Sequence, residues 1–355
     1  MMHRPNYKNI HNRFRLNGTH YSFEALTEIG YSFVKEGAPY EQAIGDFLLD
    51  WTHASDTLIL KTSGSTGQPK LLRYHKQAMV NSALATGDFF HLQVGDKALH
   101  CLNADYIAGK MMLVRAMILG LEIDLVPPEG NVLQHTNKVY DFAAMVPLQV
   151  AHSLSQLPQI KTLIIGGAPI PKALHKEIAQ QSSACFETYG MTETVSHIAA
   201  RPINEDATPF HVLPGVSISQ DERECLVIEA PHLSDQKIIT NDLVHLVEQE
   251  AFHFRGRIDH VINSGGIKIS PEEIEAKLSP FIVQPILIAA LPDESLGEKM
   301  VLLVEGSLEV DWAALFSKAK LPHYSTPKEI HALAEFAYTP NGKIKREDTL
   351  ALLDL

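Results

Sequence analysis

The chain has 355 residues, 45% of them hydrophobic and 20% charged, a composition typical of a globular protein long enough for two domains. Its formal net charge of −12 would repel nucleic acid and anionic membranes, which excludes a general polyanion binder but not a local basic site for a small anion. Three cysteines, Cys101, Cys185 and Cys225, lie far apart without a CxxC motif, so we expect buried free thiols in a reducing compartment.

The first 18 residues carry charge but no apolar segment, so we expect no signal peptide. The most apolar helical stretch, 111–126, contains Arg115 and acidic residues and is too short to span a bilayer. No histidine or cysteine cluster has zinc-site spacing. We therefore expect a cytoplasmic protein that neither inserts into a membrane nor binds nucleic acid. The sequence carries no signal for an oligomeric state.

Short apolar runs that end near glycine or proline predict strands along most of the chain. They are residues 57–60, 121–128, 142–147, 162–169 and 225–231. Segments with helical spacing lie between some of them, one of which begins at Pro171. This alternation indicates an α/β domain with a largely parallel sheet, where ligands bind at the carboxyl ends of the strands.

The pattern changes near residue 252. Residues 252–278 read as a strand, a turn, a second strand and a helix, and residues 285–306 read as two strands joined by a polar loop. Ser270 can cap the helix, Pro271 suits its first position, and Glu273 would complete a capping box. The sequence therefore predicts a small α+β domain from about residue 260 to the end.

The stretch LKTSGSTGQPK at 60–70 follows an apolar strand and gathers hydroxyls, glycines and a lysine. Glycine lets backbone N–H groups converge on a phosphate, and hydroxyls and a lysine add donors and charge. A flexible linker would have similar residues, but order resumes at once in the following segment. Only two residues separate Gly67 from Lys70, which excludes the GxxxxGK[ST] loop of common nucleotide triphosphatases.

A second polar motif, ETYGMTET at 187–194, follows another apolar segment. Tyr189 offers a flat face for a base, Thr192 a hydroxyl for phosphate, and Glu193 a carboxylate for magnesium. A plain strand end with a turn at Gly190 would give the same residues, so this motif alone does not distinguish a nucleotide site from a turn.

Three charged side chains further along the chain have the chemistry of nucleotide ligands. Asp242 can accept bonds from ribose hydroxyls, Arg257 can pair with phosphate, and a turn at Pro340–Gly342 presents Lys343. Taken singly, each also fits a solvated loop or surface residue.

In combination, the motifs resemble the AMP-forming acyl- and aryl-CoA synthetase family of adenylate-forming ligases. They are TSGSTGQPK, GGAPIP, YGMTET, ITNDL, GRIDHVINSGGIKISPEEIE and TPNGKIKRE, in family order from about residue 57 to the end. The resemblance implies an α/β adenylate-forming ligase fold with mixed and parallel sheets. It also implies a large N-terminal domain at 1–258, with its first subdomain shortened, and a small mobile α+β domain at 259–355.

The resemblance implies a two-step reaction with ATP, Mg²⁺ and coenzyme A. A carboxylate attacks the α-phosphorus of ATP to give an acyl-adenylate and pyrophosphate, and the CoA thiol then displaces AMP. Since no enzyme nucleophile takes part, positioning and charge stabilisation would carry the catalysis.

The family's residue roles transfer to matching positions of this chain. The β- and γ-phosphates would be held by Thr62, Ser63, Gly64, Ser65, Thr66, Gly67 and Lys70. The adenine would lie between Gly167, Ala168, Pro169 and Tyr189. The catalytic groups would be Thr192 at the α-phosphate, Glu193 at magnesium, Arg257 at ribose and phosphate, and Lys343 between the reacting carboxylate and the α-phosphate. Asp242 would hold the ribose.

The family's small domain rotates between the two steps, and Asp259 matches the hinge. One orientation would bring Lys343 to the adenylation site, and the other would bring the Gly265–Gly266 loop to the pantetheine channel.

The chain departs from the family in three places. Only about 56 residues precede the phosphate motif, so much of the first subdomain must be missing or replaced. Asn241 stands where the ribose motif usually has glycine. In the acyl-site motif at 103–116, Tyr106 stands where His or Phe is common, and Lys110 is unusual.

The stretches YGMTETVSHIA and IAGKMMLVRAMILG resemble o-succinylbenzoate–CoA ligases of menaquinone synthesis. That acid has two carboxylates, and the one that does not react needs donors or a cation because burial of an unpaired charge is costly. Lys110 and Arg115 are candidates, with Ser196 and His197 as hydrogen-bonding walls. A helix-surface ion pair for Arg115 stays open, as do a benzoate or phenylacetate ligase and a non-catalytic adenylate-binding protein.

Overall fold

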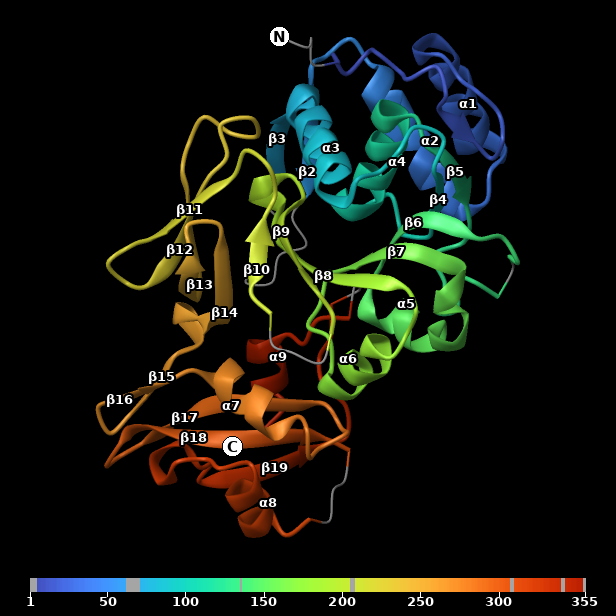
Figure 1. Ribbon diagram of the computed structural model, residues 1–355. Coiled ribbons are helices and arrows are strands. Elements are labelled where there is room, and N and C mark those ends of the chain that lie inside the picture. Colours follow the sequence, from blue (N-terminus) through green and yellow to red (C-terminus); the bar gives the residue numbers. More distant parts are fainter. Residues whose placement is uncertain are drawn as a thin grey trace. The chain divides into compact units, whose positions relative to one another are not determined.

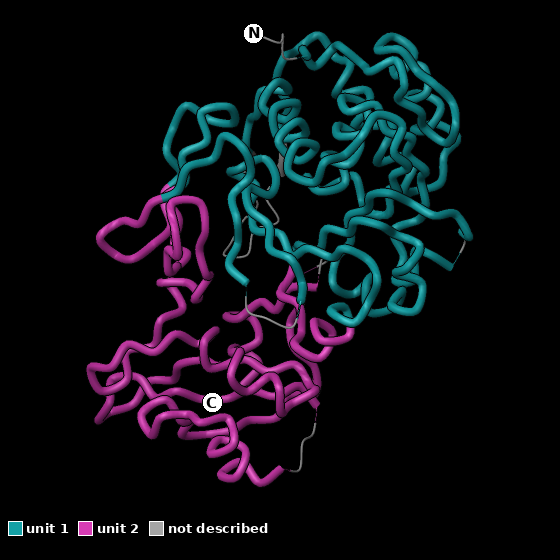
Figure 2. The backbone as a smooth tube through the Cα atoms, in the orientation of Figure 1, with its two compact units in different colours: residues 1–167, 178–218, 228–238 teal, residues 168–177, 219–227, 239–355 magenta. Residues whose placement is uncertain are grey.

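The computed structural model describes residues 5–61, 71–134, 136–204, 208–306, 310–339 and 342–353. The chain forms two compact units, coloured separately in Figure 2. Unit 1 contains residues 1–167, 178–218 and 228–238, and unit 2 contains residues 168–177, 219–227 and 239–355.

Unit 1 is built on a sheet with the strand order β1-β5-β4-β6-β7-β8-β9-β10 (Figure 1). Its strands are β1 (Arg15–Leu16), β4 (Lys97–His100), β5 (Glu122–Leu125), β6 (Tyr140–Met145), β7 (Ile160–Ile165), β8 (Ala184–Gly190), β9 (His197–Pro202) and β10 (Phe210–Val212). Pairing is parallel from β1 to β8 and antiparallel from β8 to β10. β2 (Thr57–Lys61) and β3 (Leu71–His75) form a separate antiparallel pair.

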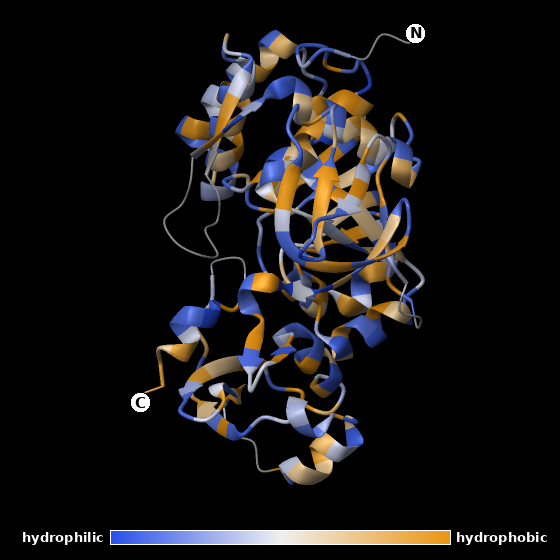
Figure 3. Ribbon diagram, turned by 90° about the vertical axis from the view of Figure 1, so that its left-hand side faces the viewer, coloured by the Kyte–Doolittle hydropathy of each residue, from blue (hydrophilic) through white to orange (hydrophobic). Residues whose placement is uncertain are grey.

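The helices of the first 200 residues alternate with these strands. They are α1 (Phe23–Glu36), α2 (Pro39–Thr52), α3 (Lys76–Phe90), α4 (Ile107–Leu119), α5 (Pro147–His152) and α6 (Lys172–Ala179), with short 3₁₀ turns η1 (Leu154–Gln159) and η2 (Thr192–Thr194). α4 is apolar on nearly every side and ends at Gly120, whose φ of 73° suits a glycine after a helix. Apolar residues colour much of this sheet orange in Figure 3.

The segment before the phosphate motif folds as a helical hairpin of α1 and α2. The two helices approach closely at Gly30 and Gly45, where a Cβ on Gly45 would lie 2.7 Å from the Gly30 carbonyl oxygen. α2 buries Phe47 and Trp51 in the main apolar core. The same core contains Leu58 of β2, the strand that precedes the phosphate motif.

The C-terminal end of α2 is capped by a lysine from a neighbouring helix. Lys76, the first residue of α3, is fully buried and donates to the carbonyl oxygens of Trp51 at 2.8 Å and His53 at 2.9 Å. The last carbonyls of a helix have no intrahelical partner and carry partial negative charge, so a cation there stabilises the helix. Burial lowers the pKa of Lys76 to about 8.

Unit 2 contains a hairpin-rich sheet edge and a small α+β body. Its strands in chain order are β11 (Ser217–Gln220), β12 (Cys225–Glu229), β13 (Ile238–Glu248), β14 (Ala251–Arg257), β15 (Ile262–Ser264), β16 (Ile267–Ile269), β17 (Ile286–Asp293), β18 (Gly297–Glu305) and β19 (Glu329–Leu333), of which β11–β13 begin or end in unit 1. Its helices are α7 (Pro271–Leu278), α8 (Trp312–Lys318) and α9 (Arg346–Leu350), with 3₁₀ turns η3 (Ile258–His260) and η4 (His323–Ser325). β17 pairs antiparallel with β18, and β19 pairs parallel with β18.

Most predicted elements are confirmed, including the largely parallel sheet, the strand at 57–60 and the paired strands within 285–306. The three cysteines are buried and free. The described part of the chain contains no helix long and apolar enough to cross a membrane.

The predicted capping box of α7 is wrong. Ser270 occupies the N-cap position, but its side chain makes no capping bond and its Oγ donates to the Arg255 carbonyl oxygen at 2.9 Å. Glu273 accepts from Arg255 Nε at 2.7 Å instead of bonding back to the cap. A tertiary partner, Arg255, thus outcompetes the local motif for both side chains.

Candidate functional site

A buried arginine of α4 forms the centre of a polar cluster in unit 1. Arg115 is 2% exposed and donates from Nε to Thr86 Oγ1 at 3.3 Å. Its Nη2 donates to Ser196 Oγ at 2.8 Å and lies 3.4 Å from Nδ1 of His197. The structure thus brings together three of the predicted acid-site residues, Arg115, Ser196 and His197, and excludes an ion pair on the helix surface for Arg115.

The partners of Arg115 are all neutral. The Thr86 hydroxyl donates to the Ser82 carbonyl oxygen at 3.0 Å, so its oxygen is free to accept from His197 Nε2 at 3.3 Å. This arrangement places the imidazole proton on Nε2 and leaves Nδ1 to accept from Arg115. Burial and the charge of Arg115 hold the pKa of His197 well below its usual value, which keeps the ring neutral.

The charge of Arg115 is uncompensated within the part of unit 1 that the structure describes. Burial alone lowers the pKa of its guanidinium to about 9, with no carboxylate acting against the shift. In the same described ranges, Nη1 has no hydrogen-bond partner. A buried cation whose protein partners are neutral can accept an anion from outside the chain.

A sharp turn connects this cluster to the ETYGMTET motif. Thr192 and Glu193 lie in η2, and Val195 follows with a φ of 66° and a ψ of −49°. The Ser196 N–H donates to the Thr194 carbonyl oxygen at 2.7 Å, so Val195 is the centre of a γ-turn. Positive φ is costly for a β-branched residue, and such strain concentrates at functional sites.

Glycine is required at the strand end beside this turn. A Cβ on Gly190 would lie 2.5 Å from the His197 Cα and 2.5 Å from the Ser196 carbonyl oxygen. The β8–β9 pairing shifts register at this position. Gly190 thus permits the chain to double back so that Glu193 is exposed while Ser196 faces Arg115.

The strand that follows the TSGSTGQPK motif is tied to the same turn. Tyr74 on β3 donates its hydroxyl to the Thr192 carbonyl oxygen at 2.6 Å. Burial, together with the charge of Glu193, raises the pKa of Tyr74 above its usual value. The predicted phosphate ligands Thr62, Ser63, Gly64, Ser65, Thr66, Gly67 and Lys70 lie outside the described residues.

Lys110 and Tyr106 lie at the start of α4, away from the Arg115 cluster. The Lys110 ammonium donates to the Ala104 carbonyl oxygen at 2.6 Å and lies 5.4 Å from the centre of the Phe47 ring. Tyr106 is the N-cap residue of the helix and is half-buried. Five residues along a helix rotate a side chain by more than a third of a turn, so Lys110 and Arg115 serve different surroundings.

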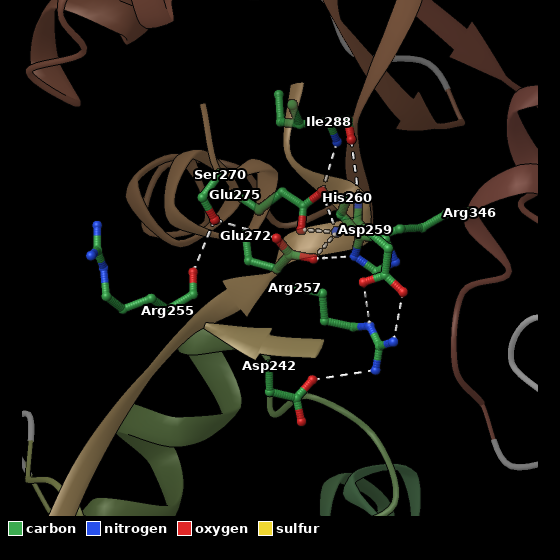
Figure 4. A network of polar contacts seen from close by, with 10 residues as sticks. All are labelled: Asp242, Arg255, Arg257, Asp259, His260, Ser270, Glu272, Glu275, Ile288 and Arg346. Carbon is green, nitrogen blue, oxygen red and sulfur yellow. Dashed lines mark hydrogen bonds and ion pairs between the residues drawn. The ribbon is translucent and has the colours of Figure 1, made fainter. Parts of the chain in front are cut away.

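In unit 2, one arginine bridges two aspartates (Figure 4). Arg257 ends β14 opposite Asp242 of β13, and its Nη1 lies 3.3 Å from Asp242 Oδ1. The same guanidinium donates to both oxygens of Asp259, at 3.0 Å and 2.7 Å. Burial pushes the pKa of Asp259 upward, but bonds and charge from Arg257 outweigh it and hold this pKa below its usual value.

The substitution in the ribose motif leaves Asp242 in place. Along β13, Thr240 and Asp242 are buried and Asn241 is exposed, as side chains on a strand alternate. Asn241 accepts from Arg223 Nη1 at 3.2 Å, and the Asp242 N–H donates to Thr240 Oγ1 at 3.1 Å. Asn241 therefore points to the opposite face from Asp242.

Lys343 lies in a tight hairpin near the end of unit 2. The Thr339 N–H donates to the Lys343 carbonyl oxygen at 2.8 Å, and the Lys343 N–H donates to Thr339 Oγ1 at 3.0 Å. Burial lowers the pKa of Lys343, the charge of Asp242 opposes the shift, and that of Arg257 adds to it. Lys343, Asp242 and Arg257 are therefore close enough for their charges to interact.

The remaining predicted cofactor residues lie in turns or beside strands. Gly265 and Gly266, with φ of 60° and 84°, form the two-residue turn between β15 and β16. Gly167 has a φ of 89° and belongs to unit 1, whereas Ala168 and Pro169 belong to unit 2. Tyr189 on β8 packs 6.0 Å from the ring centre of Phe210.

Side chains that could hold magnesium are not clustered in the described part of the chain. Within the described ranges, no group of three or more His, Cys, Asp or Glu side chains could hold a metal ion. Magnesium at nucleotide sites commonly takes one or two carboxylates and completes its shell with water and substrate phosphates. The exposed carboxylate of Glu193 fits that pattern.

Sequence reasoning missed Thr86, Tyr74 and Val195. Thr86 and His197 lie 111 residues apart, and Tyr74 and Thr192 lie 118 residues apart, so no local motif connects them. Val195 has no marker in the sequence, since β-branched residues rarely adopt positive φ. Among the residues of this cluster and its turn, Arg115 is the one that the sequence marks, because it is a charged residue within an apolar helix.

Comparisons with known proteins extend these observations. A family model described as AMP-binding enzyme matches residues 35–222, more than half of the chain. The 2-succinylbenzoate–CoA ligase of Listeria monocytogenes serovar 1/2a is 26% identical, over 92% of this chain and 76% of its own length.

Solved structures agree with the family match. An acyl-CoA synthetase (AMP-forming)/AMP-acid ligase II-like protein from Dyadobacter fermentans is 34% identical and has a TM-score of 0.61, over 92% of this chain and 98% of its own. The o-succinylbenzoate CoA synthetase of Bacillus subtilis, in complex with its acyl-adenylate intermediate, is 20% identical with a TM-score of 0.74, over 84% of this chain and 69% of its own. The adenylate-forming ligase fold predicted from the motifs is confirmed.

Proposed function

Because this chain belongs to the AMP-binding enzyme family of AMP-forming ligases, we propose that it adenylates o-succinylbenzoate with ATP and transfers the acyl group to coenzyme A. The relatives supply the reaction class, and the Arg115 cluster supports the choice of acid. AMP and pyrophosphate are the other products. The biological context that fits this reaction is menaquinone synthesis.

The Arg115 guanidinium is the observation that carries the acid assignment. It is buried, its partners in the described chain are neutral, and one of its nitrogen atoms has no partner there. An aryl acid with one carboxylate presents no second anion for it, whereas o-succinylbenzoate presents one that does not react. The pairing would give the substrate charge-assisted hydrogen bonds in a water-poor site.

In the proposed adenylation step, the chain's own groups position and neutralise the phosphates. Lys343 lies between the reacting carboxylate and the α-phosphate, Thr192 bonds the α-phosphate, and Arg257 supports the ribose with Asp242. Glu193 would hold Mg²⁺, which neutralises phosphate charge when bound. Tyr189 and Gly167–Pro169 would hold the adenine, and the loop from Thr62 to Lys70 the β- and γ-phosphates.

The second step requires a different surface of the small domain. We propose domains at 1–258 and 259–355, with Asp259 as the hinge between them. Rotation about Asp259 would withdraw Lys343 and present the Gly265–Gly266 turn to the pantetheine arm. The Arg257–Asp259 ion pair lies next to the proposed pivot and would be strained or remade during the rotation.

The test is AMP release with ATP, Mg²⁺ and CoA across a matched set of acids. The set contains o-succinylbenzoate, 4-oxo-4-phenylbutanoate, which lacks the ring carboxylate, and 2-butanoylbenzoate, which lacks the chain carboxylate. Benzoate and phenylacetate complete it. We expect o-succinylbenzoate to exceed every monoacid in kcat/KM by about 100-fold, because a buried cation left without its anion costs about 2–5 kcal/mol.

Equal turnover of a monoacid and o-succinylbenzoate would contradict the acid assignment and leave the ligase assignment standing. Binding of ATP without AMP release from any acid would favour the non-catalytic adenylate-binding alternative. Formation of AMP without an acyl-CoA product would mean that water takes the acyl group from the adenylate, and would contradict CoA as the acceptor.

A further inference from the structure

The segment that follows Lys343 is anchored to helix α7 by an arginine. Arg346 begins α9, and its Nη2 donates to both carboxylate oxygens of Glu275, at 2.9 Å and 2.7 Å. Its Nη1 donates to the Ile288 carbonyl oxygen at 3.0 Å. Glu275 also accepts from the Ile288 N–H at 2.7 Å (Figure 4). One ion pair therefore fixes the start of α9 to both α7 and β17.

The same arginine lies near a second carboxylate that reaches toward the proposed hinge. Glu272, on α7, lies 3.5 Å from Arg346 Nη2 and accepts from His260 Nδ1 at 2.5 Å. His260 is the residue after Asp259. Figure 4 shows the side chains of His260, Glu272, Glu275 and Arg346 converging between α7 and β17. Contacts thus run without a break from the residue beside Asp259 to the residue three positions after Lys343.

The ion pair that anchors α9 is largely shielded from solvent. The side chains of Arg346 and Glu275 are only 22% and 19% exposed, and Nη2 of Arg346 contacts both carboxylate oxygens. Because Nη1 bonds the Ile288 carbonyl oxygen while Nη2 bonds Glu275, two nitrogen atoms of the rigid guanidinium fix its direction as well as its distance. By contrast, Glu273 on the same helix pairs with Arg255, whose side chain is 47% exposed.

The hairpin that carries Lys343 leads directly into this anchor. Its hairpin closes through the Lys345 N–H, which donates to the Ala337 carbonyl oxygen at 2.8 Å, and Arg346 follows directly. A shift of Arg346 therefore moves the hairpin that carries the Lys343 ammonium. Misplacement of a reacting group by about 1 Å can cost about 100-fold in rate.

We propose that Arg346 and Glu275 are positioning residues for Lys343, and that Glu272 and His260 link this anchor to the hinge. The proposal rests on the proposed adenylation chemistry, though on no particular acid. It predicts that the anchor serves the first half-reaction, in which Lys343 acts, and leaves the second half-reaction unaffected.

The test compares two neighbouring glutamates of α7, with Glu275→Gln as the variant and Glu273→Gln as its matched control. Adenylate formation is measured as pyrophosphate release before CoA is added, using whichever acid the wild-type protein activates. Thioester formation is measured from supplied acyl-adenylate and CoA. We expect Glu275→Gln to lower kcat for adenylate formation by about 10- to 100-fold, with KM for ATP and the thioester rate near wild type.

Arg346→Lys tests the geometry, because it keeps the charge but has a single nitrogen and cannot bond Glu275 and the Ile288 carbonyl oxygen with two separate ones. We expect it to fall between the wild-type protein and Arg346→Ala in adenylate formation. Equal loss in both half-reactions, or equal loss in the Glu273→Gln control, would overturn the proposal and assign the ion pair to general stability.

A readout independent of activity separates this proposal from the proposed function. Hydrogen exchange of the peptide carrying Lys343 should be faster in Glu275→Gln and Arg346→Ala than in Glu273→Gln and wild type. If no acid is activated by the wild-type protein, the proposed function fails while this measurement still judges the anchor. Unchanged exchange in both anchor variants would overturn it.

Discussion

Two arginines, the buried Arg115 in unit 1 and the largely shielded Arg346 in unit 2, have opposite kinds of partner. Arg115 bonds to a threonine, a serine and a neutral histidine, whereas Arg346 forms an ion pair with Glu275 and has Glu272 nearby. A buried cation is costly unless it is paired. The difference shows that the fold satisfies Arg346, and it supports the proposal that a ligand completes Arg115.

A third cation, Lys343, has surroundings intermediate between those of Arg115 and Arg346. Asp242 and Arg257 act on it with opposite charges, and burial lowers the pKa of its ammonium. Among the described residues, Lys343 is therefore neither held in a close ion pair, as Arg346 is, nor surrounded only by neutral groups, as Arg115 is. Such a cation can exchange protein partners for phosphate and carboxylate oxygens during a reaction.

The largest expected effect comes from Lys343→Ala. Removal of one preorganised donor from a developing charge costs about 100- to 1000-fold in kcat. We expect that loss in adenylate formation, with thioester formation from supplied acyl-adenylate near the wild-type rate. Rapid-quench measurement of each half-reaction checks this. An unchanged rate of adenylate formation in a variant that still binds ATP would remove Lys343 from the chemistry and leave it a surface cation.

Arg115→Met tests the other side of the comparison. Methionine retains much of the volume of arginine without its charge, so the variant should lower kcat/KM for o-succinylbenzoate by about 100-fold. Replacement of a buried charge by an apolar side chain is often neutral or stabilising, so Tm should stay equal or rise.

Monoacids provide the control for Arg115→Met. They should be turned over at the wild-type rate or faster, because they carry no second carboxylate to lose a partner. A fall in Tm of several degrees with all acids affected equally would assign Arg115 to folding and would break the contrast with Arg346.

The sequence predicted which charged residues lie together in unit 2 but not the distant contacts of unit 1. Motif order located Asp242, Arg257 and Lys343, and the structure brings these three charges together in unit 2. Composition of a helix also marked Arg115 as unusual. The sequence could not predict Thr86 as the partner of Arg115, because the contacts of Thr86 join α3 to α4 and β9 and depend on tertiary packing.

The glutamates of α7 show how a local rule can mislead. Glu273 stands at the position of a capping box, yet Arg255 takes its carboxylate, and the contacts of Glu272 and Glu275 come from residues up to 74 positions away. Local spacing specifies that a helix begins at Pro271, as it does. It carries no information about which distant cation will compete for each carboxylate.

Lys76→Met sharpens the comparison, since Lys76 is also a buried cation with neutral partners. Its partners are the terminal carbonyls of α2, which are themselves partially negative, so Lys76 should stabilise the fold and play no part in catalysis. We expect the variant to lose about 1–3 kcal/mol in free energy of unfolding and to keep the wild-type kcat. Urea denaturation and steady-state turnover measure the two effects, and a loss of turnover without a loss of stability would contradict this assignment.

The contribution of Lys76 to the free energy of unfolding should increase with pH. The pKa of Lys76 falls from its ordinary 10.5 to about 8 in the folded chain. Between these values the unfolded chain holds a proton that the folded chain has released, so the stability contributed by Lys76 rises with pH. The stability difference between wild type and Lys76→Met should therefore grow from pH 8 to pH 10.5. A difference that shrinks over this window would show that the ammonium is not disfavoured by burial.

The smallest expected effect concerns an exposed pair, Lys138 and Asp124. Lys138 Nζ lies 2.7 Å from Asp124 Oδ2, as close as Arg346 lies to Glu275, but the lysine side chain is 64% exposed. Solvent screens such a pair, so Lys138→Ala should change the free energy of unfolding by less than about 1 kcal/mol. Adding salt to 1 M should reduce even this difference, because exposed charges are screened within about 3 Å at that concentration. A larger, salt-independent loss would show that proximity of charges decides their effect, whereas the contrast between Arg115 and Arg346 requires that burial decides it.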